Sequence, residues 1–178
     1  ALVGLRTNSR SLLDLSQAAP SFPPAEVVIE RIAAAAHEPE AGRYPPQPGL
    51  PALRAAFADD LSLGYDADIS ADSVLITAGC NQAFCVVASA LTSPGDEALL
   101  IAPFYFNHDM WLRLEGVQVQ HLDPGPDLVP DPNHADRLLT DKTRLITLVS
   151  PGNPTGVTIP KEVIHGFADL ARRRGIAL

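Results

Sequence analysis

With 178 residues, 46% of them hydrophobic, the chain is long enough to bury one sizeable core and too apolar to be disordered. Its formal net charge of −8 argues against a nucleic-acid or anionic-membrane partner, because either would need a concentrated basic surface. No apolar stretch is long enough to cross a bilayer, and the apolar start is too short for a signal-peptide core. We therefore expect a cytoplasmic protein that binds neither nucleic acid nor membrane.

Cysteine and histidine spacing gives no sign of a metal site. The two cysteines, Cys80 and Cys85, lack the CxxC spacing of redox and zinc motifs. The five histidines are scattered along the chain without the spacing of metal ligands. We expect reduced thiols and no bound metal.

The first third of the chain has helical periodicity. Apolar residues recur at helical spacing over residues 25–37 and again over residues 50–62. The proline-rich stretch GRYPPQPG separates these two segments and is typical of a stiff loop. The sequence therefore predicts two amphipathic helices joined by a loop.

From residue 74 onward, short apolar runs alternate with helical segments. Strands are expected over residues 74–77, 98–102, 117–122 and 145–149. Helices are expected after AGCNQ, around Met110 and Trp111, and from Pro160 to Gly175, where proline suits the first turn and glycine the end. Apolar strands separated by helices are typical of a parallel sheet covered on both faces, so the predicted fold class is α/β.

The last three residues, Ile176 to Leu178, look like the opening of a further buried strand. A strand that stops inside a parallel sheet would leave the backbone groups of its neighbour unpaired. We therefore expect this chain to be the N-terminal part of a longer protein.

Three loops of the predicted sheet carry candidate ligand contacts, because ligands of open α/β sheets bind outside the carboxyl ends of the strands. The loop at residues 78–81 enters a helix through Gly79, and free N–H groups at a helix start suit a phosphate dianion. The loop at residues 103–106, PFYF, brings aromatic rings to the same edge. The loop SPGNPTG, at residues 150–156, holds Asn153 rigidly between a glycine and a proline.

Each loop alone also fits an ordinary structural role, as a strand-to-helix turn, as core aromatics or as a turn before the last helix. Together they favour a ligand with a phosphate, a flat ring and an acceptor on that ring. Pyridoxal phosphate meets this description better than a nucleotide, for which no ribose-binding carboxylate or magnesium ligand is apparent.

These motifs, in this order, resemble the class I/II aminotransferases, which are fold-type I pyridoxal-phosphate enzymes. The stretches that carry the resemblance, from about residue 14 to the end, are LSQAAPSFPP, RYPPQPGLPALRAAFA, VLITAGCNQAF, APFYFNHDMW and LVSPGNPTGVTIPKEV. The resemblance implies a three-layer sandwich around a mainly parallel sheet. Residues 1–43 would form an N-terminal arm and a small-domain segment, and residues 44–178 the first part of the cofactor-binding large domain.

The resemblance also implies contacts with pyridoxal phosphate. The backbone of Gly79, Cys80 and Asn81 would hold the phosphate. Tyr105 would stack on the pyridine ring. Asn153 would donate its amide to the ring oxygen and also contact the substrate.

Other implied roles concern the substrate and a second subunit. Ala18 would offer its backbone N–H to the substrate carboxylate, at a position where the family commonly has glycine. Tyr44 would reach the phosphate of the neighbouring subunit, which implies a homodimer. The peptide bonds before Pro103 and Pro154 would be cis.

The implied activity is transfer of an amino group between an amino acid and a 2-oxo acid. It needs a Schiff-base lysine and an aspartate at the pyridine nitrogen, which in the family lie beyond the point where this chain stops. Lys142 and Lys161, the only lysines, lack the right context, so we expect no catalytic residue in this chain and no activity from it alone. A β-lyase or decarboxylase with the same cofactor and a lysine-free effector-binding module remain as alternatives.

Overall fold

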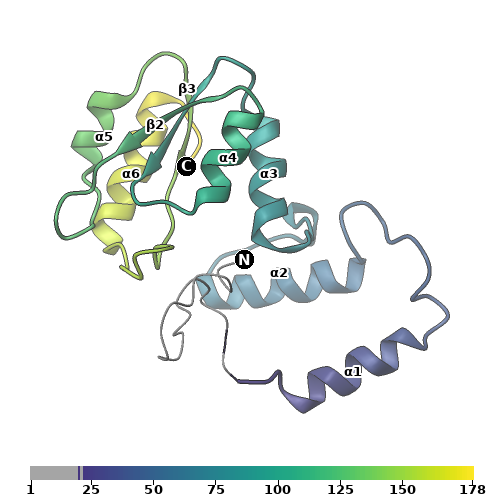
Figure 1. The fold of residues 1–178 in the computed structure, drawn as a ribbon. Helices are drawn as coiled ribbons and strands as arrows, with labels where there is room; N and C mark the ends of the chain where they lie inside the picture. Colours follow the sequence, from purple (N-terminus) through teal and green to yellow (C-terminus); the bar gives the residue numbers. More distant parts are fainter. Residues whose placement is uncertain (1–19, 21) are drawn as a thin grey trace, which may run out of the picture. The chain divides into compact units, whose positions relative to one another are not determined.

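A computed structural model describes residue 20 and residues 22–178 of the chain (Figure 1). The chain divides into two compact units, residues 1–47 and 48–178. In the first unit, α1 (Glu26–Ala36) confirms the helix expected over residues 25–37. The apolar residues of α1, Val28, Ile29 and Ile32, are exposed.

The second unit combines helices with a small parallel sheet. Its elements in chain order are α2 (Pro51–Tyr65), the short 3-10 helix η2 (Ala71–Ser73), α3 (Gly79–Leu91), β1 (Glu97–Ile101), α4 (Phe106–Leu114), β2 (Gln118–Leu122), α5 (Pro132–Leu138), β3 (Thr143–Thr147) and α6 (Lys161–Arg174). The helices expected at α2, α3, α4 and α6 and the strands expected at β1, β2 and β3 are confirmed. The short helix α5 was not predicted.

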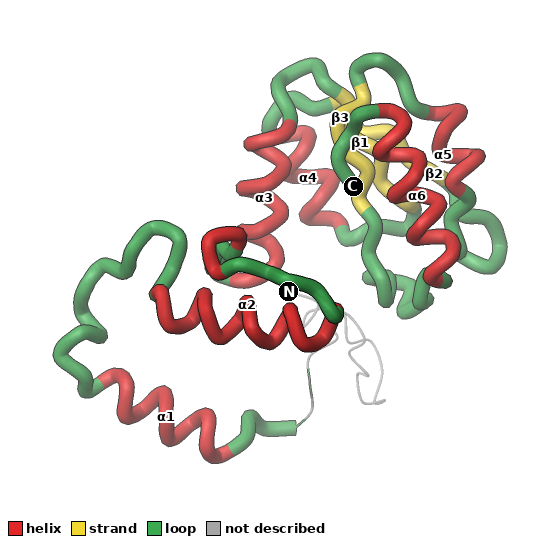
Figure 2. Tube along the Cα trace, turned by 180° about the vertical axis from the view of Figure 1, so that it is seen from behind, coloured by secondary structure: helices red, strands yellow, loops and turns green. Residues whose placement is uncertain are grey.

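The sheet has the order β2–β1–β3, and both pairings are parallel. Successive side chains of the central strand β1 point to opposite faces. Leu100 packs with Ala88 of α3 and Leu112 of α4, whereas Leu99 packs with Phe167 of α6. Figure 2 shows α5 and α6 on one side of the strands and α3 and α4 on the other. The second unit is therefore the three-layer α/β sandwich that the sequence predicts.

The strand expected over residues 74–77 is wrong. Val74 has an extended backbone, but the segment pairs with no strand in the described part of the chain. Its polar groups bind elsewhere: Arg54 Nε of α2 donates to the Val74 carbonyl at 2.8 Å, and the Ile76 N–H donates to the Pro48 carbonyl at 3.0 Å. An apolar run predicts an extended backbone, but a β-strand also needs a neighbouring strand to pair with. A local sequence pattern does not show whether such a neighbour exists.

The C-terminal residues do lie along the sheet. Ala177 forms an isolated parallel bridge with Leu145 of β3. The Ala177 N–H donates to the Arg144 carbonyl at 2.9 Å, and the Ile146 N–H donates to the Ala177 carbonyl at the same distance. Ile176 to Leu178 thus begin to extend the sheet beyond β3, in agreement with the expected strand-like segment.

None of the helices within residues 22–178 combines the length and the apolar character that a membrane span requires.

Arg54 should be important for the stability of the second unit. Its guanidinium, whose side chain is only 16% exposed, also donates to the Ala71 carbonyl at 2.6 Å. Replacing Arg54 with leucine leaves two carbonyls without these donors, so we expect a loss of about 1–3 kcal/mol in the free energy of unfolding, measured by urea denaturation. The control Arg172→Leu changes an arginine whose side chain is 76% exposed and should cost about 0.5 kcal/mol or less. Equal losses in the two variants would contradict the role of Arg54.

Candidate active site

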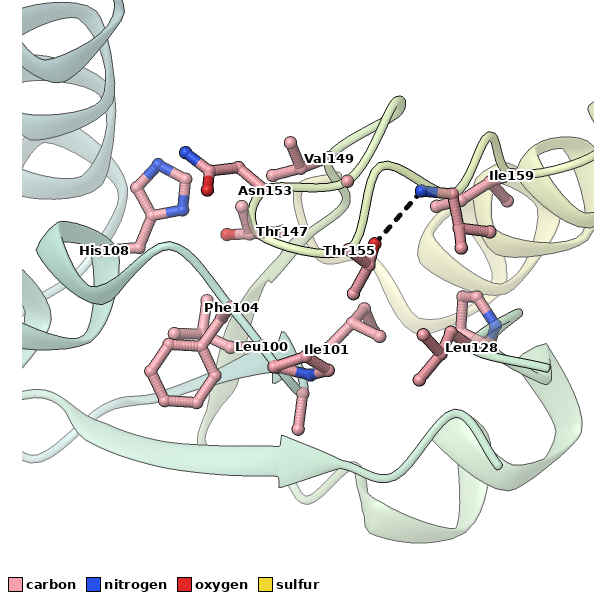
Figure 3. Close-up of a pocket in the computed structure, with 15 residues that line it drawn as sticks. Leu100, Ile101, Phe104, His108, Leu128, Thr147, Val149, Asn153, Thr155 and Ile159 are labelled. Atoms are coloured by element: carbon pink, nitrogen blue, oxygen red, sulfur yellow. Dashed lines mark hydrogen bonds between the residues drawn. The ribbon is translucent and has the colours of Figure 1, made fainter. Parts of the chain in front are cut away.

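Two loops meet at the carboxyl end of the sheet. Because β1 and β3 are parallel neighbours, the loop after β1 and the loop after β3 leave the sheet at the same edge. Both contribute to one pocket, shown in Figure 3, where Phe104 comes from the first loop and Asn153 and Thr155 from the second. The structure thus brings together two of the three loops singled out in the sequence.

The third loop leads into α3 through Gly79. This glycine has φ +82°, in the left-handed region that glycine favours. Nothing lies within 4 Å of the place where a side chain would start, so backbone conformation rather than crowding accounts for glycine here. Thr77 Oγ1 donates to the Gly79 carbonyl at 3.1 Å, and Gln82 Oε1 accepts from the Ala78 N–H at 2.5 Å. These bonds fix the entry into the helix.

The first turn of α3 is open to a ligand. Gly79, Cys80 and Asn81 are all exposed. N–H groups in the first turn of an α-helix have no acceptor within the helix, and the helix dipole adds partial positive charge there. The Gly79 N–H already donates to the Thr77 carbonyl at 2.8 Å, so an anion at this turn would depend first on the N–H groups that follow it.

Tyr105 connects this turn to the loop after β1. Its phenol oxygen lies 2.8 Å from Asn107 Nδ2 and 3.4 Å from Asn81 Nδ2. Tyr105 immediately precedes α4, with an extended backbone, and is half-buried. Two predicted cofactor contacts, Asn81 and Tyr105, are therefore direct neighbours although they lie 24 residues apart.

Asn153 lies in a loop closed by its own backbone. The Gly152 N–H donates to the Val157 carbonyl at 2.8 Å, and the Gly156 N–H donates to the Gly152 carbonyl at 2.7 Å. Ser150 Oγ accepts from the Ile159 N–H at 2.9 Å. These bonds hold the loop in shape while Asn153 itself remains exposed.

The cis peptide bonds implied by the resemblance are present. The Ala102–Pro103 and Asn153–Pro154 bonds are both cis. A third cis bond, Ser150–Pro151, was not predicted.

The other residues considered in the sequence belong to other segments of the chain. Ala18 falls outside the described residues. Tyr44 belongs to the first unit, and its side chain is fully exposed. Lys142 precedes β3 at the amino end of the strand, opposite the edge that carries the loops, and Lys161 is exposed in the first turn of α6.

Sequence reasoning missed His108. It follows Tyr105 by three residues, which places both near one face of the first turn of α4. The His108 ring stacks on Phe84 of α3 with centroids 4.0 Å apart and meets the Tyr105 ring edge-on at 5.4 Å. Burial lowers the pKa of His108, so its imidazole is neutral near pH 7. Its spacing of three residues from Tyr105 was the sequence feature that could have identified His108 as a site residue.

Thr147, the last residue of β3, was also missed. Its Oγ1 atom is buried and has no hydrogen-bond partner among the described residues. The residue lines the same pocket as His108 and Asn153 (Figure 3). A buried hydroxyl normally has a partner, so this atom offers a polar contact to a further group at the pocket.

A cluster of polar side chains links α4 to β2 beside these residues. Asp109 accepts from Arg113 Nε at 2.7 Å, and its other carboxylate oxygen lies 3.1 Å from His121 Nε2 of β2. The hydrogen bond from Arg113 lowers the pKa of Asp109. Phe104 stacks on the His121 ring with centroids 4.6 Å apart, so the loop after β1 is also held from this side.

Among the residues that the structure describes, no group of three or more histidine, cysteine, aspartate or glutamate side chains is placed so that it could hold a metal ion.

Comparison with known proteins extends the sequence resemblance. The model of the family "Aminotransferase class I and II" matches residues 10–178. The chain is 32% identical over 170 residues to the probable aspartate/prephenate aminotransferase of Thermus aquaticus, covering 94% of this chain and 44% of that protein. It is 34% identical over 159 residues to nicotianamine aminotransferase 1 of rice, Oryza sativa subsp. japonica, covering 88% of this chain and 32% of the relative.

Solved structures agree. A mutant of Thermus thermophilus aspartate aminotransferase superposes with a TM-score of 0.85 at 30% identity, covering 91% of this chain and 45% of that one. The Thermotoga maritima aspartate aminotransferase superposes with a TM-score of 0.86 at 28% identity, covering 98% and 46%. The chain thus spans less than half the length of these relatives. It belongs to the class I and II aminotransferases and shares the α/β fold of their fold-type I members.

Proposed function

We propose that the protein containing this chain is a pyridoxal-phosphate-dependent aminotransferase, which moves an amino group between an amino acid and a 2-oxo acid. The observation that carries the proposal is the contact between Tyr105 and Asn81, at 3.4 Å. It joins an aromatic ring to an open helix start that suits a phosphate. Family membership gives this pairing of ring and anion contacts its interpretation.

The residues present fit pyridoxal phosphate. The open first turn of α3 would supply backbone N–H donors for the phosphate through Cys80 and Asn81. The Gly79 N–H, which donates to the Thr77 carbonyl at 2.8 Å, would join them only by leaving that carbonyl. Tyr105 supplies a flat ring for stacking, and exposed Asn153 supplies an amide donor for the ring oxygen. The unpartnered Thr147 hydroxyl is consistent with a further polar group at this pocket.

When bound, pyridoxal phosphate supplies an electron sink for the negative charge that develops on the substrate carbon. The residues of this chain would bind and orient it. Asn153, held by its closed loop, would keep its amide donor in place without reorganisation during the reaction. His108, neutral near pH 7, would place an uncharged polar ring beside Tyr105.

The rest of the expected site belongs to the same proposal. Ala18 and Asn153 would contact the substrate, and the protein would act as a homodimer in which Tyr44 reaches the phosphate of the neighbouring subunit. Residues 1–43 would belong to the arm and the small domain, and residues 44–178 to the large domain. The relatives carry different substrate names, among them aspartate/prephenate and nicotianamine, so the proposal names the substrate class only.

The proposal predicts that the full-length protein binds pyridoxal phosphate with a visible absorbance band. One amino acid from a panel of acidic, aromatic and aliphatic donors should abolish that band, and a 2-oxo acid should restore it. Asn153→Ala should weaken cofactor binding about tenfold, because it removes one hydrogen bond to a charged acceptor. Asn133→Ala, at an exposed position of α5, is the matched control.

Other results of these measurements would favour a different function. Release of carbon dioxide or of a β-substituent without amino transfer would indicate a decarboxylase or a β-lyase. Cofactor binding without a response to any amino acid would favour the effector-binding module. Failure of the full-length protein to bind the cofactor would contradict the proposal.

The lowered pKa of His108 predicts a pH-dependent stability. The folded state disfavours the protonated ring, so this contribution is present above the unfolded-state value of about 6.5 and is lost as pH falls through the folded-state pKa. Urea denaturation at about pH 7.5 and about pH 5.5 should therefore show a smaller acid-induced loss in His108→Leu than in the wild type. His165→Leu, on the exposed side of α6, is the control. Identical pH dependence in His108→Leu and the wild type would refute the burial effect.

A further inference from the structure

We propose that Asn107 is a positioning residue that fixes the ring of Tyr105 by holding its hydroxyl group, with Asn81 as the second contact. The inference rests on the proposed function, in which Tyr105 stacks on pyridoxal phosphate. It adds a residue outside the contacts implied by the sequence motifs.

The contact between Asn107 and Tyr105 has good geometry. Asn107 Nδ2 lies 2.8 Å from the phenol oxygen, within the usual range for a hydrogen bond. Both side chains are half-buried, which limits competition from water. The bond acts at the far end of the tyrosine side chain, where a small rotation about the Cα–Cβ bond moves the ring most. It therefore controls ring orientation more effectively than a contact near the backbone.

Asn81 reaches the same oxygen from another element. Its Nδ2 lies 3.4 Å away, at the long end of the range, so it contributes less than Asn107. The phenol oxygen can accept two hydrogen bonds and still donate its own proton. One oxygen thus links the start of α4, through Asn107, to the first turn of α3, through Asn81. In the proposed function that turn holds the phosphate, so ring and phosphate contacts would be fixed relative to each other.

The aromatic neighbours of Tyr105 restrain the orientation of its ring less than the contacts of its hydroxyl group do. His108 meets the ring edge-on, with the planes at 89°, and is itself stacked on Phe84. Phe106 is tilted by 59° against the ring and is 60% exposed, so it provides little restraint. Among the described residues, loss of Asn107 would leave the Tyr105 hydroxyl with the long contact to Asn81 alone.

The test combines a cofactor-independent readout with a binding measurement on the full-length protein. The protein is labelled with 3-fluorotyrosine, and the fluorine resonance missing from Tyr105→Phe identifies Tyr105. Asn107→Leu removes the donor at similar volume. Asn107→Asp keeps the shape and accepts the Tyr105 hydroxyl proton, so the hydrogen bond is retained in the reverse direction. Asn133→Leu makes the same chemical change at an exposed position of α5.

In the cofactor-free protein, Asn107→Leu should shift the Tyr105 resonance towards that of free fluorotyrosine, whereas Asn107→Asp and Asn133→Leu should leave it near the wild-type position. The dissociation constant for pyridoxal phosphate should rise about tenfold in Asn107→Leu and stay within about threefold of the wild-type value in Asn107→Asp. Should the leucine variant fail to fold, Asn107→Ala replaces it, because alanine is tolerated in the first turn of a helix.

An unchanged Tyr105 resonance in folded Asn107→Leu or Asn107→Ala would overturn the positioning role, whatever the function of the protein. A shifted resonance with unchanged cofactor affinity would overturn its link to the cofactor. Wild-type protein that binds no cofactor would overturn the proposed function and the cofactor link together, while the fluorine spectra would still decide whether Asn107 fixes the ring.

Discussion

The parallel pairing of β1 with β3 is the constraint on which the candidate site depends. The middle of β1 is buried on both faces, with Leu99 and Leu100 on opposite sides, so the strand has no freedom to shift its register without moving apolar groups into the wrong layer. Since both strands run in the same direction, the loops that follow them leave the sheet side by side. Phe104 and Asn153 line one pocket for this reason, although they lie far apart in the sequence.

Local periodicity was sufficient to predict the elements that bury an apolar face. It failed where a pairing partner or a buried polar residue determines whether a strand forms and where it begins. The spacing of apolar residues alone predicted the buried face of α6, which carries Phe167 and Leu170. Residues 74–77 look the same as a strand in sequence, but Arg54 of α2 binds the Val74 carbonyl in place of a neighbouring strand. The expected strand 145–149 is observed as β3, two residues earlier. Its first residue, Thr143, is buried despite its hydroxyl, which accepts from the Thr140 N–H at 3.0 Å.

The predictable part of the site is the part that motifs encode locally. Gly79 and SPGNPTG were recognisable because their backbone geometry needs particular residues at adjacent positions. Contacts between elements have no such signature: Asn81 approaches Tyr105 only because α3 and α4 pack on the same face of the sheet. Sequence reasoning placed both residues at the site but gave no reason for their contact. It overlooked His108 because histidine spacing was considered only for metal ligation.

The site therefore uses two different ways of holding a side chain. The backbone around Asn153 is held from within its loop, through hydrogen bonds between residues 152 and 157. Tyr105 is fixed from outside, by Asn107 of α4 and Asn81 of α3, so its orientation depends on the relative placement of two helices. A change that shifts α3 against α4 would thus move the Tyr105 ring and leave the Asn153 loop intact. The orientation of the Tyr105 ring is therefore sensitive to changes in the core, because Ala88 and Leu112, which pack with Leu100, set the positions of both helices.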